Sequence, residues 1–173
     1  MTNWCVITGG PSSGKTTTVN ILKARGYRTT IEHARHFLDT QRITGRTVAE
    51  IRSNQAAFQR GVLEMQIEQE AMLDAEKLVF LDRALPDALA YYRLLGLPPD
   101  PRLLGALPSA SYRKVFLLDL LPLVKDYART EDEAAQQRIH MLLGEVYLEL
   151  GHPVVTVPPL GPDERVDYIL AHL

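Results

Sequence analysis

The chain has 173 residues, of which 46% are hydrophobic and 23% are charged, a balance typical of a soluble globular protein. Its 19 basic and 21 acidic residues give a net charge of −2, which argues against a nucleic-acid binder because such proteins carry a basic excess. The single cysteine, Cys5, excludes an intrachain disulfide and favours a reducing, cytoplasmic location. No apolar run approaches the ~20 residues of a membrane span, and the first residues do not form a signal peptide, so no membrane association is expected.

Strand-like and helix-like segments alternate along the chain. Short apolar runs predict the strands, and apolar residues spaced three to four apart predict the helices. Residues 48–76 lack proline and predict one long helix or two nearly continuous ones, and residues 97–110 predict a loop or a broken short helix. The other predicted elements are, in chain order, strand 4–8, helix 15–25, strand 28–31, helix 34–41, strand 78–81, helix 86–95, strand 115–118, helix 131–150, strand 154–157 and helix 162–170.

This alternation predicts an α/β fold with a five-stranded parallel sheet and helices on both faces. We expect residues 1–173 to form a single domain, since roughly 150 residues is a typical domain length. Ligands bind beyond the carboxyl ends of the strands in such sheets. The residues that directly follow each predicted strand are therefore expected to converge on one site.

The strongest functional signal lies between the first predicted strand and helix. Residues 9–16 read Gly-Gly-Pro-Ser-Ser-Gly-Lys-Thr and match the phosphate-loop pattern G-x-x-x-x-G-K-[ST] in full. Backbone N–H groups of such a loop surround phosphate oxygens, and the following helix presents its positive end to them. Lys15 is expected to reach the β- and γ-phosphates, and Thr16 to supply a hydroxyl to Mg²⁺. The loop residues expected to bind the nucleotide are Gly9, Gly10, Pro11, Ser12, Ser13, Gly14, Lys15 and Thr16.

The third predicted strand ends in a carboxylate, Asp82, followed by Arg83. Four apolar residues before an aspartate form a Walker-B pattern, whose carboxylate holds a water on Mg²⁺. A solvated acidic turn is the alternative for Asp82. The planar guanidinium of Arg83 suits the recognition of phosphate or carboxylate, although it could also simply pair with Asp82 or Asp87.

Taken together, the sequence resembles small bacterial P-loop proteins of the AAA family, in a group similar to the nicotinamide riboside kinase domain of bacterial NAD regulators. More distantly, it resembles thymidylate and deoxynucleoside kinases, in which an Asp-Arg pair also closes this strand. The resemblance covers nearly the whole chain. It implies a P-loop kinase-like fold that has a lid, and a protein that binds ATP. The segments that carry it are 6–17, 32–35, 81–92, 124–126, 129–133 and 164–166.

The resemblance also implies roles for single residues. In P-loop kinases, Thr17 would contact the α-phosphate, and a carboxylate at the position of Glu32 often accepts the proton of the acceptor hydroxyl. Charge at the start of a helix is the alternative explanation of Glu32. Arg35 is expected to orient Glu32 or to touch the substrate. Arg83 is expected to bind the substrate as well.

A lid is expected at residues 122–138, where the resemblance places a segment that closes over the phosphates. Arg129 is its candidate catalytic residue, because an arginine from a lid can neutralise charge on the transferring phosphoryl group. A solvated charged stretch at a helix start is the alternative. His140, His152 and His172 show no metal-ligand spacing, and no role is expected for them.

Two functions remain open at this point. The first is a Mg²⁺-dependent kinase that moves the γ-phosphoryl of ATP to a small acceptor, either nucleoside-like or phosphorylated, with Lys15, Glu32, Asp82 and Arg129 as catalytic residues. The second is a regulatory, nucleotide-operated ATPase with slow hydrolysis and a protein partner. The guanine-reading motif [NT]-K-x-D is missing, which favours ATP over GTP. The sequence leaves the acceptor and the oligomeric state open.

Overall fold

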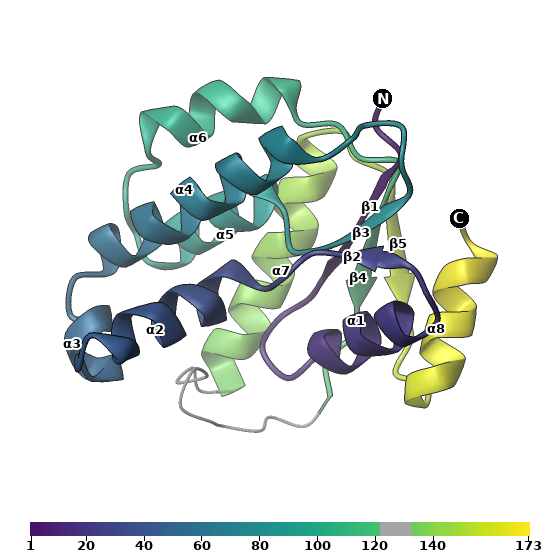
Figure 1. Ribbon diagram of the computed structural model, residues 1–173, viewed down its shortest axis with the longest axis horizontal. Coiled ribbons are helices and arrows are strands. Elements are labelled where there is room, and N and C mark those ends of the chain that lie inside the picture. The colour runs from purple at the N-terminus through teal and green to yellow at the C-terminus, as the bar shows by residue number, and fades with distance from the viewer. Residues whose placement is uncertain (122–132) are drawn as a thin grey trace.

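The computed structural model describes residues 1–121 and 133–173 and is built on a five-stranded parallel sheet (Figure 1). The strands are β1 (Trp4–Thr8), β2 (Arg28–Thr29), β3 (Val79–Asp82), β4 (Lys114–Leu118) and β5 (Val154–Val157). Their order across the sheet is β2-β3-β1-β4-β5, and every neighbouring pair is parallel. The predicted α/β class and the five strands are thus confirmed.

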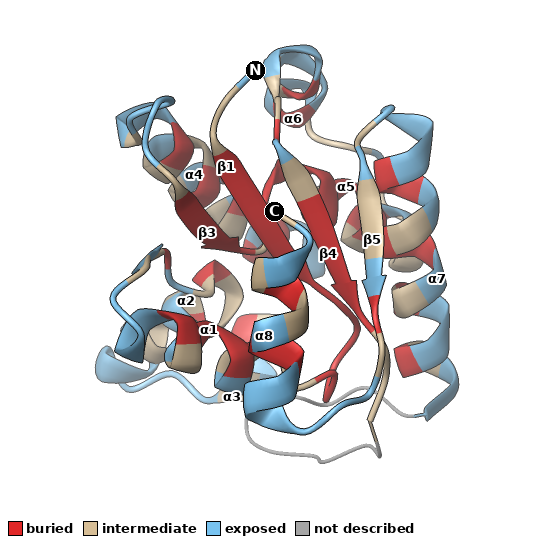
Figure 2. Ribbon diagram, turned by 90° about the vertical axis from the view of Figure 1, so that its right-hand side faces the viewer, coloured by how far each residue is buried: buried red, intermediate tan, exposed pale blue. Residues whose placement is uncertain are grey.

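Helices cover both faces of this sheet (Figures 1 and 2). Two of them, α1 (Lys15–Ala24) and α8 (Pro162–Ala171), lie on one face. On the other lie α5 (Leu85–Leu94) and α7 (Glu133–Glu149), with α4 (Gln55–Met72) and α6 (Pro101–Ala106) packed outside them. Within the described residues, no helix is long and apolar enough to cross a membrane. The remaining helices of the described residues are α2 (His33–Ile43) and α3 (Val48–Arg52), and a 3-10 turn follows α6 at Leu107–Ser109.

The central strands are buried on both faces, which explains their continuous apolar runs. In β1, Cys5 and Ile7 pack against α1 and α8, whereas Trp4 and Val6 pack on the opposite side with Tyr147 of α7. Figure 2 shows β1, β3 and most of β4 as buried. The carboxyl ends of β1 and β3 therefore emerge from a rigid core and can position side chains precisely.

Strand β2 ends earlier than predicted, at Thr29 rather than at residue 31. The backbone N–H of Thr30 still bonds to the Phe80 carbonyl at 3.0 Å, but the N–H of Asp82 donates to the Thr30 hydroxyl at 2.9 Å. A side chain thus replaces the backbone as the partner of Asp82. The backbone hydrogen bonds between β2 and β3 end at this point, and the chain turns toward Glu32.

Residues 48–76 contain two helices, α3 and α4, so the alternative of two nearly continuous helices is confirmed. The Asn54 side chain accepts a hydrogen bond from Ala57 N at 3.0 Å and caps the start of α4. Residues 97–110 contain the short helix α6, so the broken-helix alternative is confirmed there. The start of α6 is also capped, since the Asp100 side chain accepts a hydrogen bond from Arg102 N at 2.9 Å.

Gly61, which interrupts the periodicity of α4, lies against Phe37 of α2. A Cβ at this position would overlap Cε2 and Cζ of the Phe37 ring. We expect Gly61→Ala to lower the free energy of unfolding by about 1–3 kcal/mol, because overpacking outweighs the better helix propensity of alanine. Gly105→Ala in α6 is the matched control: apart from its chain neighbours and the backbone of its own helix, no atom of the described residues lies within 4 Å of a Cβ there, and the variant should not be destabilised. Urea unfolding measures both, and equal effects would contradict the close contact.

Candidate active site

The phosphate loop connects β1 to α1 at the carboxyl edge of the sheet. Gly14 adopts a φ of +81°, which glycine tolerates best, and its carbonyl accepts hydrogen bonds from the N–H and hydroxyl of Thr18, both at 3.0 Å. The loop and the first turn of α1 therefore form one continuous unit. The structure places residues 9–14 between β1 and α1, and Lys15 and Thr16 in the first turn of α1, where Thr17 is exposed.

Three side chains from distant elements hold this loop from outside. Gln136 Nε2 donates to the Pro11 carbonyl at 2.6 Å, and Arg165 Nη1 donates to the Ser13 carbonyl at 2.5 Å. The N–H of Gly10 donates to Nδ1 of His140 at 3.3 Å. Burial lowers the pKa of His140, which favours the neutral ring that this acceptor role requires. The expectation that His140 has no role is thus wrong: it supports the loop.

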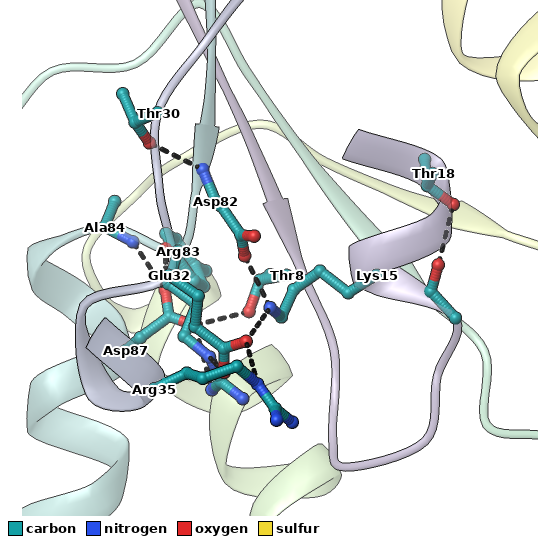
Figure 3. Close-up of polar contacts among 12 residues, drawn as sticks. Thr8, Lys15, Thr18, Thr30, Glu32, Arg35, Asp82, Arg83, Ala84 and Asp87 are labelled. Carbon is teal, nitrogen blue, oxygen red and sulfur yellow. Dashed lines mark hydrogen bonds and ion pairs between the residues drawn. The ribbon is translucent and has the colours of Figure 1, made fainter. Parts of the chain in front are cut away.

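Lys15 lies at the centre of a buried cluster of charges (Figure 3). Its Nζ is 2.5 Å from Asp82 Oδ1 and 3.4 Å from Glu32 Oε2. The side chains of Lys15 and Asp82 are 5% and 6% exposed, so water screens their attraction little. Burial raises the pKa of Asp82, and the charge of Lys15 opposes that rise. The structure thus brings together the three residues predicted for phosphate charge, metal and acceptor.

Glu32 precedes α2 but makes no side-chain hydrogen bond to the helix start. Its carboxylate faces three cations instead, since Arg83 Nε lies 3.5 Å from Oε1 and Arg35 Nε lies 4.0 Å from Oε2, in addition to Lys15 (Figure 3). This arrangement favours the site role over helix capping. It also places Arg35 where it can orient Glu32, as one of the two predicted roles requires.

Arg83 has a backbone conformation that is rare for a residue with a side chain. Its φ is +67°, and its N–H donates to the Ile7 carbonyl at 3.1 Å. Strained conformations of this kind cluster at functional sites. The guanidinium lies over the ring of Tyr91 at 5.1 Å, and its Nη1 is 3.7 Å from Asp87 Oδ1. Arg83 therefore forms an ion pair with Asp87, whereas it forms none with Asp82 in the described structure.

Asp87 anchors this side of the site, although the sequence analysis names it only as a possible partner of Arg83. Its carboxylate accepts hydrogen bonds from the Thr8 hydroxyl at 2.5 Å, from the Ala84 N–H at 3.1 Å and from the Tyr147 hydroxyl. Each partner comes from a different element: the end of β1, the start of α5, and α7. Asp87 thereby fixes the turn that carries Arg83.

The residues predicted to hold Mg²⁺ have the chemistry that this ion needs. Thr16 Oγ1 is buried without a hydrogen-bond partner among the described residues, and the Asp82 carboxylate lies in the same cleft, which Glu32 also lines. Hydroxyl and carboxylate oxygens, completed by nucleotide phosphates, are typical ligands of Mg²⁺. Thr16 and Asp82 thus fit a magnesium ion that the nucleotide brings with it.

A cavity beside Glu32 lies between α2, α4 and α5 and borders the phosphate loop at Pro11. One side is polar and charged, and the other is formed by apolar and aromatic side chains. Its lining includes Glu32, Arg35, Arg83, Asp87, Gln59, Gln66, Leu38, Phe58, Val62 and Tyr91. An acceptor bound here would have Glu32 at one end, next to the position that Lys15 gives the phosphates.

A buried carboxylate, Glu70, lies next to this cavity and holds one of its lining residues, Gln66. Its oxygens accept hydrogen bonds from Gln66 Nε2 at 2.8 Å, from the Tyr112 hydroxyl at 2.9 Å and from the Leu85 N–H at 3.1 Å. Burial raises the pKa of Glu70 from 4.5 to about 7. The folded protein therefore binds this proton more tightly than the unfolded chain does.

The raised pKa of Glu70 predicts a specific pH dependence of stability. Its contribution is full below about pH 4.5 and is lost as the pH rises through about 7, at no more than about 1.4 kcal/mol per pH unit. Glu70→Gln, whose amide needs no proton, should flatten the curve of unfolding free energy across this window, whereas Glu68→Gln on the exposed side of α4 should leave it unchanged. Urea unfolding between pH 4.5 and 7.5 is the measurement, and parallel curves for both variants would contradict the assignment.

The predicted lid lies mostly outside the described residues. Arg129 and the rest of 122–132 are among those not described, while residues 133–138 form the first turns of α7. The roles expected of Arg129 and of the lid therefore stay predictions.

Comparisons with known proteins agree with this fold. Deoxyadenosine kinase from M. mycoides with bound dATP is similar over 98% of this chain and 97% of its own, with a TM-score of 0.66 and 15% identity. NadR protein in complex with NAD and AMP-PNP is similar over 97% of this chain, with a TM-score of 0.67 and 18% identity; the chain spans about half of NadR, 48% of its length. At these identities the likeness concerns the fold, which is that of P-loop kinases.

Sequence comparison gives the family. No curated protein matches the chain. A sequence profile described as "AAA domain" matches residues 4–165, which include the phosphate loop, Glu32, Asp82 and Arg83. A match over nearly the whole length, on a P-loop fold, shows that the chain belongs to this family of AAA domains.

Proposed function

We propose that the protein is a Mg²⁺-dependent kinase that transfers the γ-phosphoryl group of ATP to a small acceptor, nucleoside-like or already phosphorylated. The position of Glu32 is the observation that carries the proposal. Its carboxylate lies 3.4 Å from Nζ of Lys15 and lines the cavity beside the phosphate loop. A hydrolase needs only a water at this place, whereas a cavity of this kind provides room for an acceptor.

The chemistry follows from these positions. An acceptor hydroxyl attacks the γ-phosphorus, its oxygen forms the new P–O bond, and the bond to the bridging oxygen breaks, which releases ADP. Glu32 accepts the hydroxyl proton, as its reach into the cavity allows. Lys15 and Arg83, with Arg129 from the expected lid, neutralise charge on the phosphoryl oxygens. Thr16 and Asp82 would hold Mg²⁺, which would supply further charge neutralisation when the nucleotide is bound.

The cavity lining supports a nucleoside-like acceptor. Phe58 and Tyr91 offer aromatic faces, and the amides of Gln59 and Gln66 can both donate and accept hydrogen bonds. The structures of similar fold are consistent with this class: one is a deoxyadenosine kinase, and NadR was solved in complex with NR. Arg35 and Arg83 would suit a phosphorylated acceptor equally well.

We further propose that residues 1–173 act as one domain, because the core clusters on both faces share the strands of a single sheet. The single thiol, Cys5, is buried in β1 and is consistent with work in the reducing cytoplasm.

ADP release from Mg²⁺-ATP tests the proposal. The rate is measured alone and with pools of nucleosides, nucleotides, sugars and vitamins, with Lys15→Met as the control for contaminating activity. We expect one pool to accelerate release, and its deconvolution to give the acceptor. Slow release that no pool changes would favour the regulatory ATPase instead, and the search would then turn to a protein partner.

A further inference from the structure

Arg165, in the first turns of α8, is buried against the phosphate loop. The residue is 2% exposed, and its Nη1 donates to the Ser13 carbonyl at 2.5 Å. A Cβ on Gly14 would lie 2.6 Å from the same nitrogen, so the guanidinium packs directly on the loop backbone. The contact joins residues 152 positions apart in the sequence, which makes it a feature of the fold rather than of local structure.

The charge of Arg165 is not neutralised by its own helix. Asp163 and Asp167, its acidic neighbours on α8, pair with Arg25 at 2.9 Å and 2.5 Å, and Glu164 accepts from the N–H of Gly161 at 3.2 Å. Within residues 1–121 and 133–173, no carboxylate forms an ion pair with Arg165, and its Nε and Nη2 are buried without a hydrogen-bond partner. Burial also lowers its pKa, and the charge of Asp119 opposes this.

A buried cation without a carboxylate is costly, because the charge loses its hydration and each donor without an acceptor loses a hydrogen bond to water. Such a group is compensated when an anion binds nearby. Lys15, the other buried cation at the loop, already has Asp82 and Glu32 within 3.4 Å. The positive potential that Arg165 adds at Ser13 and Gly14 is thus well placed to act on a bound polyphosphate.

The hydrogen bond of Arg165 also acts through the peptide it contacts. The Ser13 carbonyl and the Gly14 N–H belong to one planar trans peptide, so they point in opposite directions. The N–H of Gly14 therefore points away from Arg165, as expected for a phosphate-loop amide that faces the nucleotide. A carbonyl that accepts a charged hydrogen bond makes the N–H of its own peptide a stronger donor.

We propose that Arg165 is a positioning residue of the nucleotide site: it fixes the Ser13–Gly14 peptide and adds positive charge behind the loop, so that the protein binds nucleotides more tightly as their phosphate chain lengthens. The inference rests on the nucleotide-binding half of the proposed function and is independent of the acceptor. Its signature is a loss that is larger for ATP than for ADP, because a purely structural role would weaken both equally.

The test compares Arg165→Met with Arg25→Met. The control removes an arginine that contacts α8 from the exposed side, through Asp163 and Asp167, without touching the loop. Affinities for Mg²⁺-ATP and ADP are measured by competition against a fluorescent ATP analogue, which confines the readout to the nucleotide site. We expect Arg165→Met to weaken ATP by about tenfold or more and ADP by less, and Arg25→Met to bind both like the wild type.

Equal affinity of Arg165→Met and the wild type, or an equal loss for ATP and ADP, would overturn the proposal. Arg165→Lys is the second variant if the methionine variant does not fold; it keeps the charge with one donor group, so a smaller but still phosphate-dependent loss is expected, and wild-type affinities would overturn the proposal. Wild-type protein that binds neither nucleotide would instead contradict the proposed function itself.

Discussion

Glu32→Gln is expected to reduce phosphoryl transfer by about 10²- to 10⁴-fold while ATP still binds at least as tightly as to the wild type. The amide has the size of the carboxylate but cannot accept the acceptor's proton. ATP affinity should hold or rise, because the substitution removes an anion that lies 3.4 Å from Nζ of Lys15. Acceptor-stimulated ADP release and nucleotide titration measure the two effects separately.

The matched control is Glu64→Gln, which removes an exposed carboxylate of α4 that pairs with Arg102 outside the cavity. Its turnover should equal that of the wild type. If Glu32→Gln also turned over at the wild-type rate, Glu32 would not be the acceptor base. Its cluster with Lys15, Arg35 and Arg83 would then serve only to hold the loop.

Lys15→Met is expected to have the second large effect, on both activity and stability. Transfer should fall by about 10³-fold or more, because the loop loses the cation nearest to the transferring phosphoryl group. The nucleotide-free protein should lose about 3–5 kcal/mol of stability, since Asp82, 6% exposed, would remain buried without its partner at 2.5 Å. Urea unfolding gives the second quantity.

The stability of Lys15→Met is expected to depend on pH and on Asp82. Asp82 has a raised pKa, so protonation at lower pH relieves the unpaired charge, and the stability deficit of Lys15→Met should narrow as the pH falls. The double variant Lys15→Met with Asp82→Asn should recover much of the lost stability without recovering activity. A deficit that is independent of pH and not recovered would show that the Lys15–Asp82 pair contributes little to the fold.

The parts of the site that the sequence predicts are those encoded locally. The phosphate loop is eight consecutive residues. Asp82 ends β3, Arg83 follows it, and Glu32 lies three residues beyond β2, so all three lie near the carboxyl ends of parallel strands, which meet at one edge of the sheet. The strands at residues 4–8 and 154–157 have the predicted bounds because short apolar runs leave little choice. The predicted length of strand β2 is too great, because the side chain of Thr30, and not its backbone, accepts the hydrogen bond from the Asp82 N–H.

The supporting residues could not be predicted because their roles arise from distant packing. Gln136 and Arg165 contact the loop across 125 and 152 residues, and each looks like an ordinary polar residue of an amphipathic helix. Asp87 was recognised only as a partner for Arg83, since its bonds to Thr8 and Tyr147 depend on how α5 and α7 pack. A buried polar residue on the sheet-facing side of a helix is the signal that could have suggested them.

The fate of the γ-phosphoryl group tests the central claim most directly. ATP labelled at its γ-phosphate is incubated with the protein, Mg²⁺ and the acceptor pool that most accelerates ADP release, or with all pools combined if none does. A kinase places the label in a phosphorylated acceptor, in an amount equal to the ADP formed, and Glu32→Gln abolishes this product. Label recovered only as inorganic phosphate, whatever acceptors are present, would contradict the kinase and leave a nucleotide-hydrolysing switch in its place.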